Sequence, residues 1–319
     1  SKTQLRIQLQ GHPIPSLRNK TPMADSKSQY HVRSHSFPTK PHPLFQQCEE
    51  HLCKLGASNA TSSSSISHKL SGLEHLHDCV EKLLQLPLTQ QALVKGRQEK
   101  WVDQVVDGSL RLLDICSAAK DAVLHTKECA REIQSTMRRR RAAEASLENE
   151  IRKYSASRKV VKKAIQKALG SLKGVESRIS SSPSNKDDSE TMALASVLKE
   201  VEKATLAVFE SLLSFVSGTK SQSKLSSWSL ASKLLTQSKR VGCEEEERVA
   251  NEFEKVDSVL QIVIQYSTSK SDKCPSNNDN VQTDLRNLEL CIQNFEERLE
   301  RLFRRLIKTR VSLLNILNN

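Results

Sequence analysis

Glycine and aromatic residues are scarce in this chain of 319 residues, which has only 9 Gly, 7 Phe, 3 Tyr and 2 Trp. Sandwiches, barrels and doubly wound sheets need many glycine-containing turns and strands rich in β-branched or aromatic side chains. Leu, Lys, Glu, Gln and Ser are abundant instead, and all of these except Ser are good helix formers. The composition therefore predicts an all-α protein.

Long apolar runs and paired cysteines are also missing. No apolar run reaches the roughly 18 to 20 residues of a membrane-spanning helix, and no apolar signal-peptide core opens the chain. The eight cysteines are scattered without a CxxC pair, as is typical of a reducing compartment. We expect an intracellular, cytoplasmic protein, with a peripheral position at a membrane, the nucleus or a plastid as alternatives. Residues 1–22 are basic enough for a transit peptide, but we expect translation to begin at Met23.

Signatures of enzymes are absent from the sequence. It contains no GxxxxGK[ST], GxGxxG or HExxH motif. His75 and Cys79 are spaced by one helical turn, and Cys48 and His51 could supply a second pair of zinc ligands. Nothing in the spacing forces the two pairs together, so we interpret them as ordinary surface histidines and packed cysteines. The sequence predicts no catalytic residue, no metal and no cofactor, and hence a protein that is not an enzyme.

The chain divides into a tail and a helical domain. Residues 1–43 hold seven basic residues, one acid and six of the nine prolines without apolar periodicity, which predicts a disordered basic tail. Residues 44–319 predict a helical bundle with Ser-rich loops near 57–67, 174–189, 217–229 and 267–280. Pro87 is expected to separate two helices, the second of which begins after Thr89 and continues towards Met137. Whether the bundle is one domain or two is left open.

The last helix carries the clearest periodicity. Apolar residues recur at alternating steps of three and four with one polar break, at Thr309. This seam consists of Leu285, Leu288, Ile292, Phe295, Leu299, Leu302, Leu306, Leu313 and Ile316. It is interpreted either as the packing stripe of a bundle helix or as a coiled coil with a protein partner, including a homo-oligomer. The predicted fold is an elongated helical bundle with a long coiled-coil-like C-terminal helix.

Basic residues are concentrated in a predicted helix in the middle of the chain and just before it. Residues 135–174 hold twelve basic residues and three acids, and the candidate surface is formed by Arg138, Arg139, Arg140, Arg141, Lys159, Lys162, Lys163 and Lys167. Such a surface suits an anionic membrane or an acidic protein, and residues 138–141 could also be a nuclear import signal. A solvated helix face is the plainer interpretation. Nucleic acid is an unlikely partner because aromatic residues and a known DNA-binding motif are missing.

The tail contains a short phosphorylation motif. Arg33, Ser34, Ser36 and Pro38 form the RSxSxP pattern that 14-3-3-type adaptors bind once the second serine is phosphorylated. Arg33 also suits a basophilic kinase, and phosphate would add nearly two negative charges to a basic segment. We therefore predict a phospho-switch at Ser36.

Several of these segments resemble a plant family described as BYPASS-like. The landmarks are residues 31–38, the segment 86–93 (LPLTQQAL), the segment 108–116 (GSLRLLDIC) and the segment 154–159 (YSASRK). The resemblance covers about residues 31–319. It implies an all-helical protein that acts in root and shoot development, with no catalytic residue or cofactor to carry over.

These observations together predict a non-enzymatic helical interaction or regulatory protein. One alternative is a peripheral membrane protein that docks on anionic lipid through the basic helix over 138–173. A second alternative is a nuclear regulatory protein.

Overall fold

The computed structural model describes residues 42–56, 62–139, 144–176, 189–218, 250–268 and 278–318. All of them belong to one compact unit, Pro41–Asn319, and they form helices without any strand. The all-α prediction is confirmed for this part of the chain. The other unit, Ser1–Lys40, holds most of the basic tail predicted over 1–43 and lies outside the described residues, whereas Pro43 already begins the first helix.

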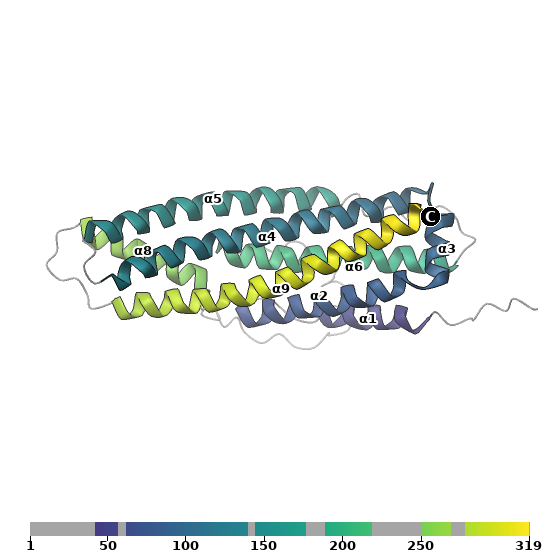
Figure 1. Ribbon diagram of the computed structural model, residues 1–319, viewed down its shortest axis with the longest axis horizontal. Helices are drawn as coiled ribbons and strands as arrows, with labels where there is room; N and C mark the ends of the chain where they lie inside the picture. The colour runs from purple at the N-terminus through teal and green to yellow at the C-terminus, as the bar shows by residue number, and fades with distance from the viewer. Residues whose placement is uncertain are drawn as a thin grey trace, which may run out of the picture. The chain divides into compact units, whose positions relative to one another are not determined.

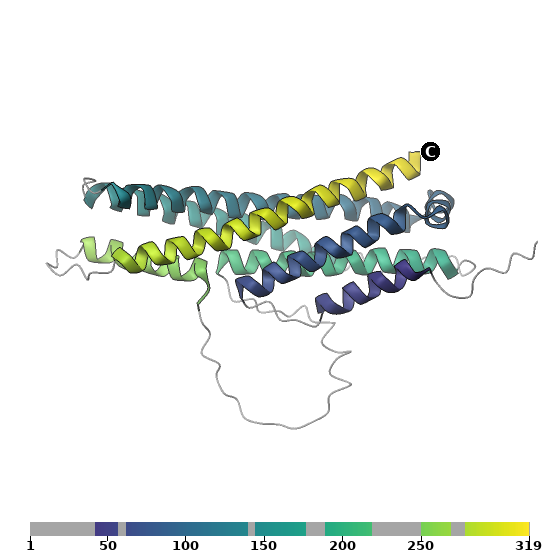
Figure 2. The ribbon, with the colours of Figure 1, turned by 60° about the horizontal axis from the view of Figure 1, so that its bottom comes forward.

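The longer helices lie side by side along the unit, and the short α3 lies across one end (Figure 1). Their bounds are α1 Pro43–Gly56, α2 Ser63–Leu84, α3 Pro87–Lys95, α4 Lys100–Arg138, α5 Glu144–Glu176, α6 Ser189–Ser217, α8 Glu252–Thr268 and α9 Asn278–Asn318. Helix α4 lies between α5 and α9, and α2 packs on the other side of α9. Figure 2 shows α8 and α6 following one another below α4 and α5.

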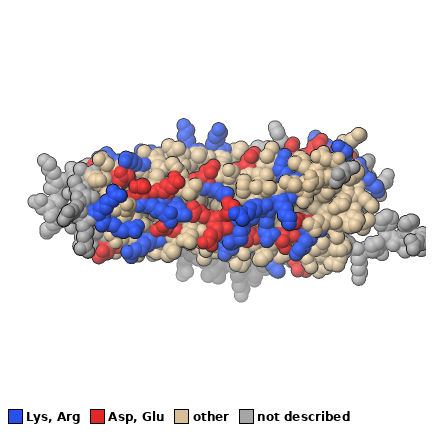
Figure 3. All heavy atoms as spheres, viewed as in Figure 1, with Lys and Arg blue, Asp and Glu red and all other residues tan. Residues whose placement is uncertain are grey.

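Ion pairs between helices fix their directions. Lys120 and Arg131 of α4 pair with Glu300 and Glu289 of α9, so the two helices are antiparallel. Residues further along α2 pair with residues further along α9, so those two helices are parallel. These α2–α9 pairs are Glu74–Arg301, Asp78–Arg305 and Glu81–Lys308. Figure 3 shows the resulting surface, on which basic and acidic side chains alternate along the bundle.

Two helix boundaries differ from the sequence prediction, and a local cap explains the first of them. The Ser62 side chain accepts a hydrogen bond from the Ser65 N–H at 3.2 Å, so α2 begins at Ser63, inside the loop expected over 57–67. Helix α9 likewise begins at Asn278, inside the loop expected over 267–280. The parts of the expected loops at 57–61, 177–188, 219–229 and 269–277 lie outside the described residues.

The single helix predicted from Thr89 to Met137 is wrong. Pro87 occupies the first turn of α3, where its missing N–H costs no hydrogen bond, and Thr89 lies inside that helix. Gly96 then ends α3, and α4 starts at Lys100. A Cβ on Gly96 would lie 2.7 Å from Cζ2 of Trp101, so the buried indole requires glycine at this corner.

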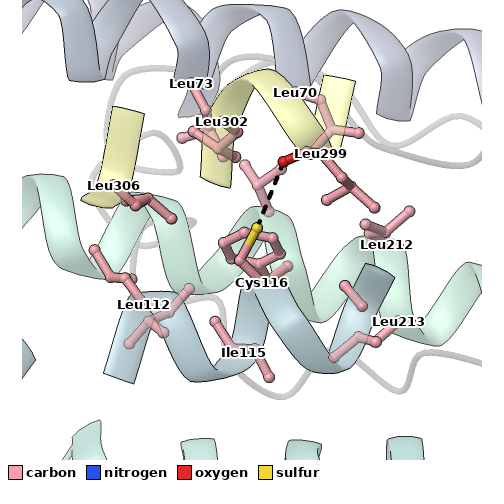
Figure 4. Packing of buried hydrophobic residues seen from close by; sticks show 14 of the residues in the cluster. Leu70, Leu73, Leu112, Ile115, Cys116, Leu212, Leu213, Leu299, Leu302 and Leu306 are labelled. Atoms are coloured by element: carbon pink, nitrogen blue, oxygen red, sulfur yellow. Dashed lines mark hydrogen bonds between the residues drawn. The ribbon is translucent and has the colours of Figure 1, made fainter. Parts of the chain in front are cut away.

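The seam of α9 lies in the core of the unit. Its residues from Leu285 to Leu306, and Leu313, are at most 2% exposed, while Ile316 is half-buried. Figure 4 shows Leu299, Leu302 and Leu306 facing apolar residues of α2, α4 and α6, and the Cys116 thiol donates to the Leu299 carbonyl at 3.8 Å. This burial agrees with the packing-stripe interpretation. A partner helix or a second copy could use the same seam only if the bundle opened.

Candidate functional site

Helix α5 forms the outer edge of the unit. Its inner stripe, which includes Ile151, Val161 and Ile165, is buried against neighbouring helices. The opposite side carries Lys159, Lys163 and Lys167, all exposed and spaced by four residues, so they share one face of the helix. No ion pair within the described residues involves these three side chains. We call them the lysine ridge.

The other cations of α5 whose side chains the structure describes pair with carboxylates. Arg152 pairs with Glu148 and Lys153 with Glu150, one helical turn away in each case. Lys162 was predicted as part of the anionic-partner surface, but its ammonium lies 2.8 Å from the Asp257 carboxylate of α8. It is half-buried and belongs to the packing of the bundle more than to the free surface.

Asp257 is the centre of a polar junction between α5, α6 and α8. It accepts hydrogen bonds from the Tyr154 hydroxyl at 2.9 Å and from the Arg158 guanidinium, which also donates to the Val216 carbonyl. Burial raises the pKa of the Asp257 carboxyl, but the hydrogen bonds and charges of Arg158 and Lys162 outweigh it and hold the pKa below its ordinary value. The junction therefore contains a permanent carboxylate whose charge is compensated locally.

The arginine run lies at the end of α4. Arg138 donates to the Gln134 side chain at 2.9 Å and to its carbonyl, and Arg139 is exposed. Two cations at a helix C-terminus suit its partial negative charge. Arg140 and Arg141 lie outside the described residues, so nuclear import through this run stays a prediction.

The predicted phospho-switch also lies outside the described residues. Ser36, Arg33 and Pro38 all precede the first described residue, at position 42. Binding of a 14-3-3-type adaptor to this motif stays a prediction.

The cysteine and histidine pairs that the sequence left unconnected do meet. The thiol of Cys48 on α1 lies 3.0 Å from that of Cys79 on α2, and the rings of His51 and His75 stack at 6.2 Å. The two cysteines contact each other and the two histidines contact each other, but the four side chains do not form one site. Within the described ranges, no group of three or more His, Cys, Asp or Glu side chains could hold a metal ion. The sequence showed the helical spacing within each pair but not the docking of α1 on α2.

A polar groove lies where the start of α2 meets α8 and α9, and sequence reasoning missed it. Its walls include Ser63, Ser67, Glu252 and Asn294. The Ser63 hydroxyl donates to Glu252 at 2.6 Å and the Ser67 hydroxyl to Asn294 at 2.8 Å. These two hydrogen bonds join the start of α2 to α8 and α9.

No helix in the described part of the chain has both the length and the apolarity to cross a membrane. Within the described residues, the lysine ridge groups three exposed cations of the predicted anionic-partner surface for which no ion pair is present.

Comparison with known protein families gives a match to most of the chain. The family model described as Protein BPS1 matches residues 69–316, which is more than half of the chain and includes all of α4, α5 and α6. No curated protein and no solved structure matched. The BPS1 family is implicated in plant development. The BYPASS-like resemblance is confirmed, and this chain belongs to the BPS1 (BYPASS1) family.

Proposed function

We propose that this protein is a non-enzymatic interaction protein of root and shoot development, and that its lysine ridge binds an acidic protein partner. The observation that carries the proposal is the contrast within α5. Its other described cations pair with carboxylates, whereas Lys159, Lys163 and Lys167 are exposed without an ion pair in the described structure.

The spacing of the ridge favours an ordered partner. Two helical turns separate Lys159 from Lys167, which is about 12 Å at 1.5 Å per residue. A partner helix with acidic residues at the same spacing would meet all three ammonium groups at once. Exposed charges of this kind raise the association rate and disfavour partners of the wrong charge, and their effect falls as salt screens them.

The test is affinity purification from plant tissue with the full chain and with a variant that carries Lys159→Glu, Lys163→Glu and Lys167→Glu. A matched control reverses three other exposed cations for which the described structure shows no ion pair, Lys95, Arg97 and Lys100 at the α3–α4 corner. We expect acidic partners to be lost with the ridge variant and kept with the control. Identical partners for all three proteins would refute the ridge as the binding surface.

Docking on anionic lipid is a second candidate, favoured by one further residue. Val160 is 64% exposed next to Lys159, and an apolar side chain flanked by lysine stems is typical of surfaces that lie in a membrane interface. Cosedimentation with phosphatidylcholine vesicles, with and without phosphatidylserine, separates the candidates. Binding that needs phosphatidylserine and is lost with the ridge variant supports the lipid, whereas no vesicle binding at low salt excludes it.

A further inference from the structure

Helix α1 is held to the rest of the unit by a single apolar stripe. Phe45, Cys48, Leu52 and Leu55 recur at steps of three and four, and all four are buried. They pack against α2 and α6, and α1 precedes the region that the family model matches. A covalent bond between α1 and α2 would add a link that does not depend on this apolar stripe.

The two thiols at this contact are already close to bonding distance. The Cys48 and Cys79 sulfurs are 3.0 Å apart, against about 2.05 Å in a disulfide, although 31 positions separate the residues in the chain. Cys79 also donates to the Leu44 carbonyl at 3.5 Å, whereas Cys116 donates to the Leu299 carbonyl and Cys129 to the Ser157 hydroxyl. The two sulfurs would have to approach by about 1 Å to form the bond.

We propose that Cys48 and Cys79 are an oxidation site, at which glutathione disulfide converts the two thiols into a disulfide that fastens α1 to α2. The thiolate of one cysteine attacks glutathione disulfide, releases one glutathione and forms a mixed disulfide. The second thiolate then attacks the protein sulfur of that mixed disulfide and releases the second glutathione. The cysteines lose two electrons, and their two protons end on the two glutathione thiols.

The same geometry makes the reaction slow. Cys48 is 0% and Cys79 4% exposed, so the oxidant reaches them only when α1 lifts from α2. Burial, with a smaller contribution from Cys79, raises the pKa of the Cys48 thiol, which lowers its thiolate fraction at neutral pH. Slow oxidation combined with a well-placed partner thiol fits a response to sustained oxidation.

The test uses the purified full chain, equilibrated in buffers with a graded ratio of glutathione to glutathione disulfide and then alkylated under denaturing conditions. Peptide mass spectrometry identifies which cysteines have become linked. We expect a Cys48–Cys79 linked peptide, with both thiols lost together, while buried Cys116 stays alkylatable. Exposed Cys53 serves as the internal reference, because it should take up glutathione at the surface.

Thermal unfolding distinguishes a bond at this site from unrelated oxidation. The oxidised wild type should melt several degrees above the reduced protein, because the cross-link restricts the unfolded chain. A Cys79→Ser variant should show no such rise, and a Cys116→Ser variant should keep it. The proposal is overturned if Cys48 and Cys79 both stay alkylatable after Cys53 has reacted, or if either becomes linked to another cysteine. These outcomes are independent of the lysine ridge, which lies on a different helix.

Discussion

Arg158 of α5 holds Asp257 of α8 with two parallel hydrogen bonds. Its Nε donates to one carboxylate oxygen at 3.0 Å, and its Nη2 donates to the other at 3.1 Å. The same Nη2 reaches the Val216 carbonyl of α6 at 2.8 Å, and the guanidinium lies over the Phe253 ring. Because only arginine offers this planar fork, one side chain joins three helices.

Asp257→Asn should destabilise the protein strongly. The substitution leaves the shape unchanged but removes the charge that compensates Arg158, whose side chain is 4% exposed. An uncompensated buried cation costs on the order of 3 kcal/mol of unfolding free energy. Urea denaturation followed by circular dichroism measures the difference.

Glu148→Gln is the matched control for this prediction. It also removes a carboxylate that pairs with an arginine of α5, but the Arg152 side chain is 56% exposed. Exposed ion pairs contribute less than about 1 kcal/mol to the unfolding free energy, so the urea midpoint should change little. If the two variants lose the same stability, burial of Arg158 is not what gives the junction its strength.

Stability should fall in mild acid because of His77. This imidazole of α2 is buried, and its Nε2 lies 3.0 Å from the Thr205 hydroxyl of α6, whose own hydrogen is donated to the Val201 carbonyl. A second proton would sit on Nδ1, which has no partner within the described structure. Burial and the charge of Arg305 lower the pKa of His77 to about 4.

The direction of the pH effect follows from this lowered pKa. The unfolded chain takes up the proton below about pH 6.5, whereas the folded protein resists it down to about pH 4, so acid favours unfolding in that window. The unfolding free energy should fall by about 3 kcal/mol between pH 6.5 and pH 4. Urea midpoints between pH 7 and 4.5 should show this slope in wild type, a weaker slope in His77→Gln, and an unchanged slope in His125→Gln, whose side chain is exposed. Equal slopes in all three proteins would exclude His77 as the source.

The sequence predicted the repetitive parts of this fold well. The steps of three and four in α9 identified the buried seam, and most of the basic helix expected over 138–173 is α5, Glu144–Glu176. These features depend on neighbours within one helix, where spacing determines which side chains share a face.

Contacts between distant segments could not be read in the same way. Lys162 looks like Lys159 and Lys163 in the sequence, and only the docking of α8 gives it Asp257 as a partner, 95 positions away. The break at Gly96 was missed for a similar reason. A glycine in a helical pattern is tolerated in many proteins, and here it is the packed Trp101 ring that makes it the corner.

Gly108→Ala should destabilise the protein although alanine is the better helix former. A Cβ at this position of α4 would lie 2.5 Å from a carboxylate oxygen of Glu202 on α6. That carboxylate is buried and held by Arg111 at 2.8 Å, so it has little freedom to move. Overpacking of this kind costs about 1 to 3 kcal/mol, which should lower the melting temperature measured by calorimetry.

Gly170→Ala provides the opposite case in the same experiment. Nothing lies within 4 Å of the Cβ position of Gly170, which is exposed in α5. The intrinsic preference of the helix for alanine should then stabilise the protein by about 0.5 to 1 kcal/mol. If both variants shift the melting temperature in the same direction, the close approach of α4 and α6 at Gly108 is contradicted.

The burial of the α9 seam predicts a contrast between two leucines of one helix. Leu299 is 0% exposed, whereas Leu290, two and a half turns earlier on the same helix, is 66% exposed. Leu299→Ala should cost about 2 to 5 kcal/mol of unfolding free energy because it leaves a cavity, and Leu290→Ala should change it by less than about 0.5 kcal/mol.

Unfolding midpoints measured over a range of protein concentrations test both the size of this loss and whether the seam packs within one chain. If the seam packs within one chain, the midpoint of wild type should not depend on concentration. A midpoint that rises with concentration, and a loss in Leu299→Ala that grows with dilution, would instead place this seam between two copies of the chain.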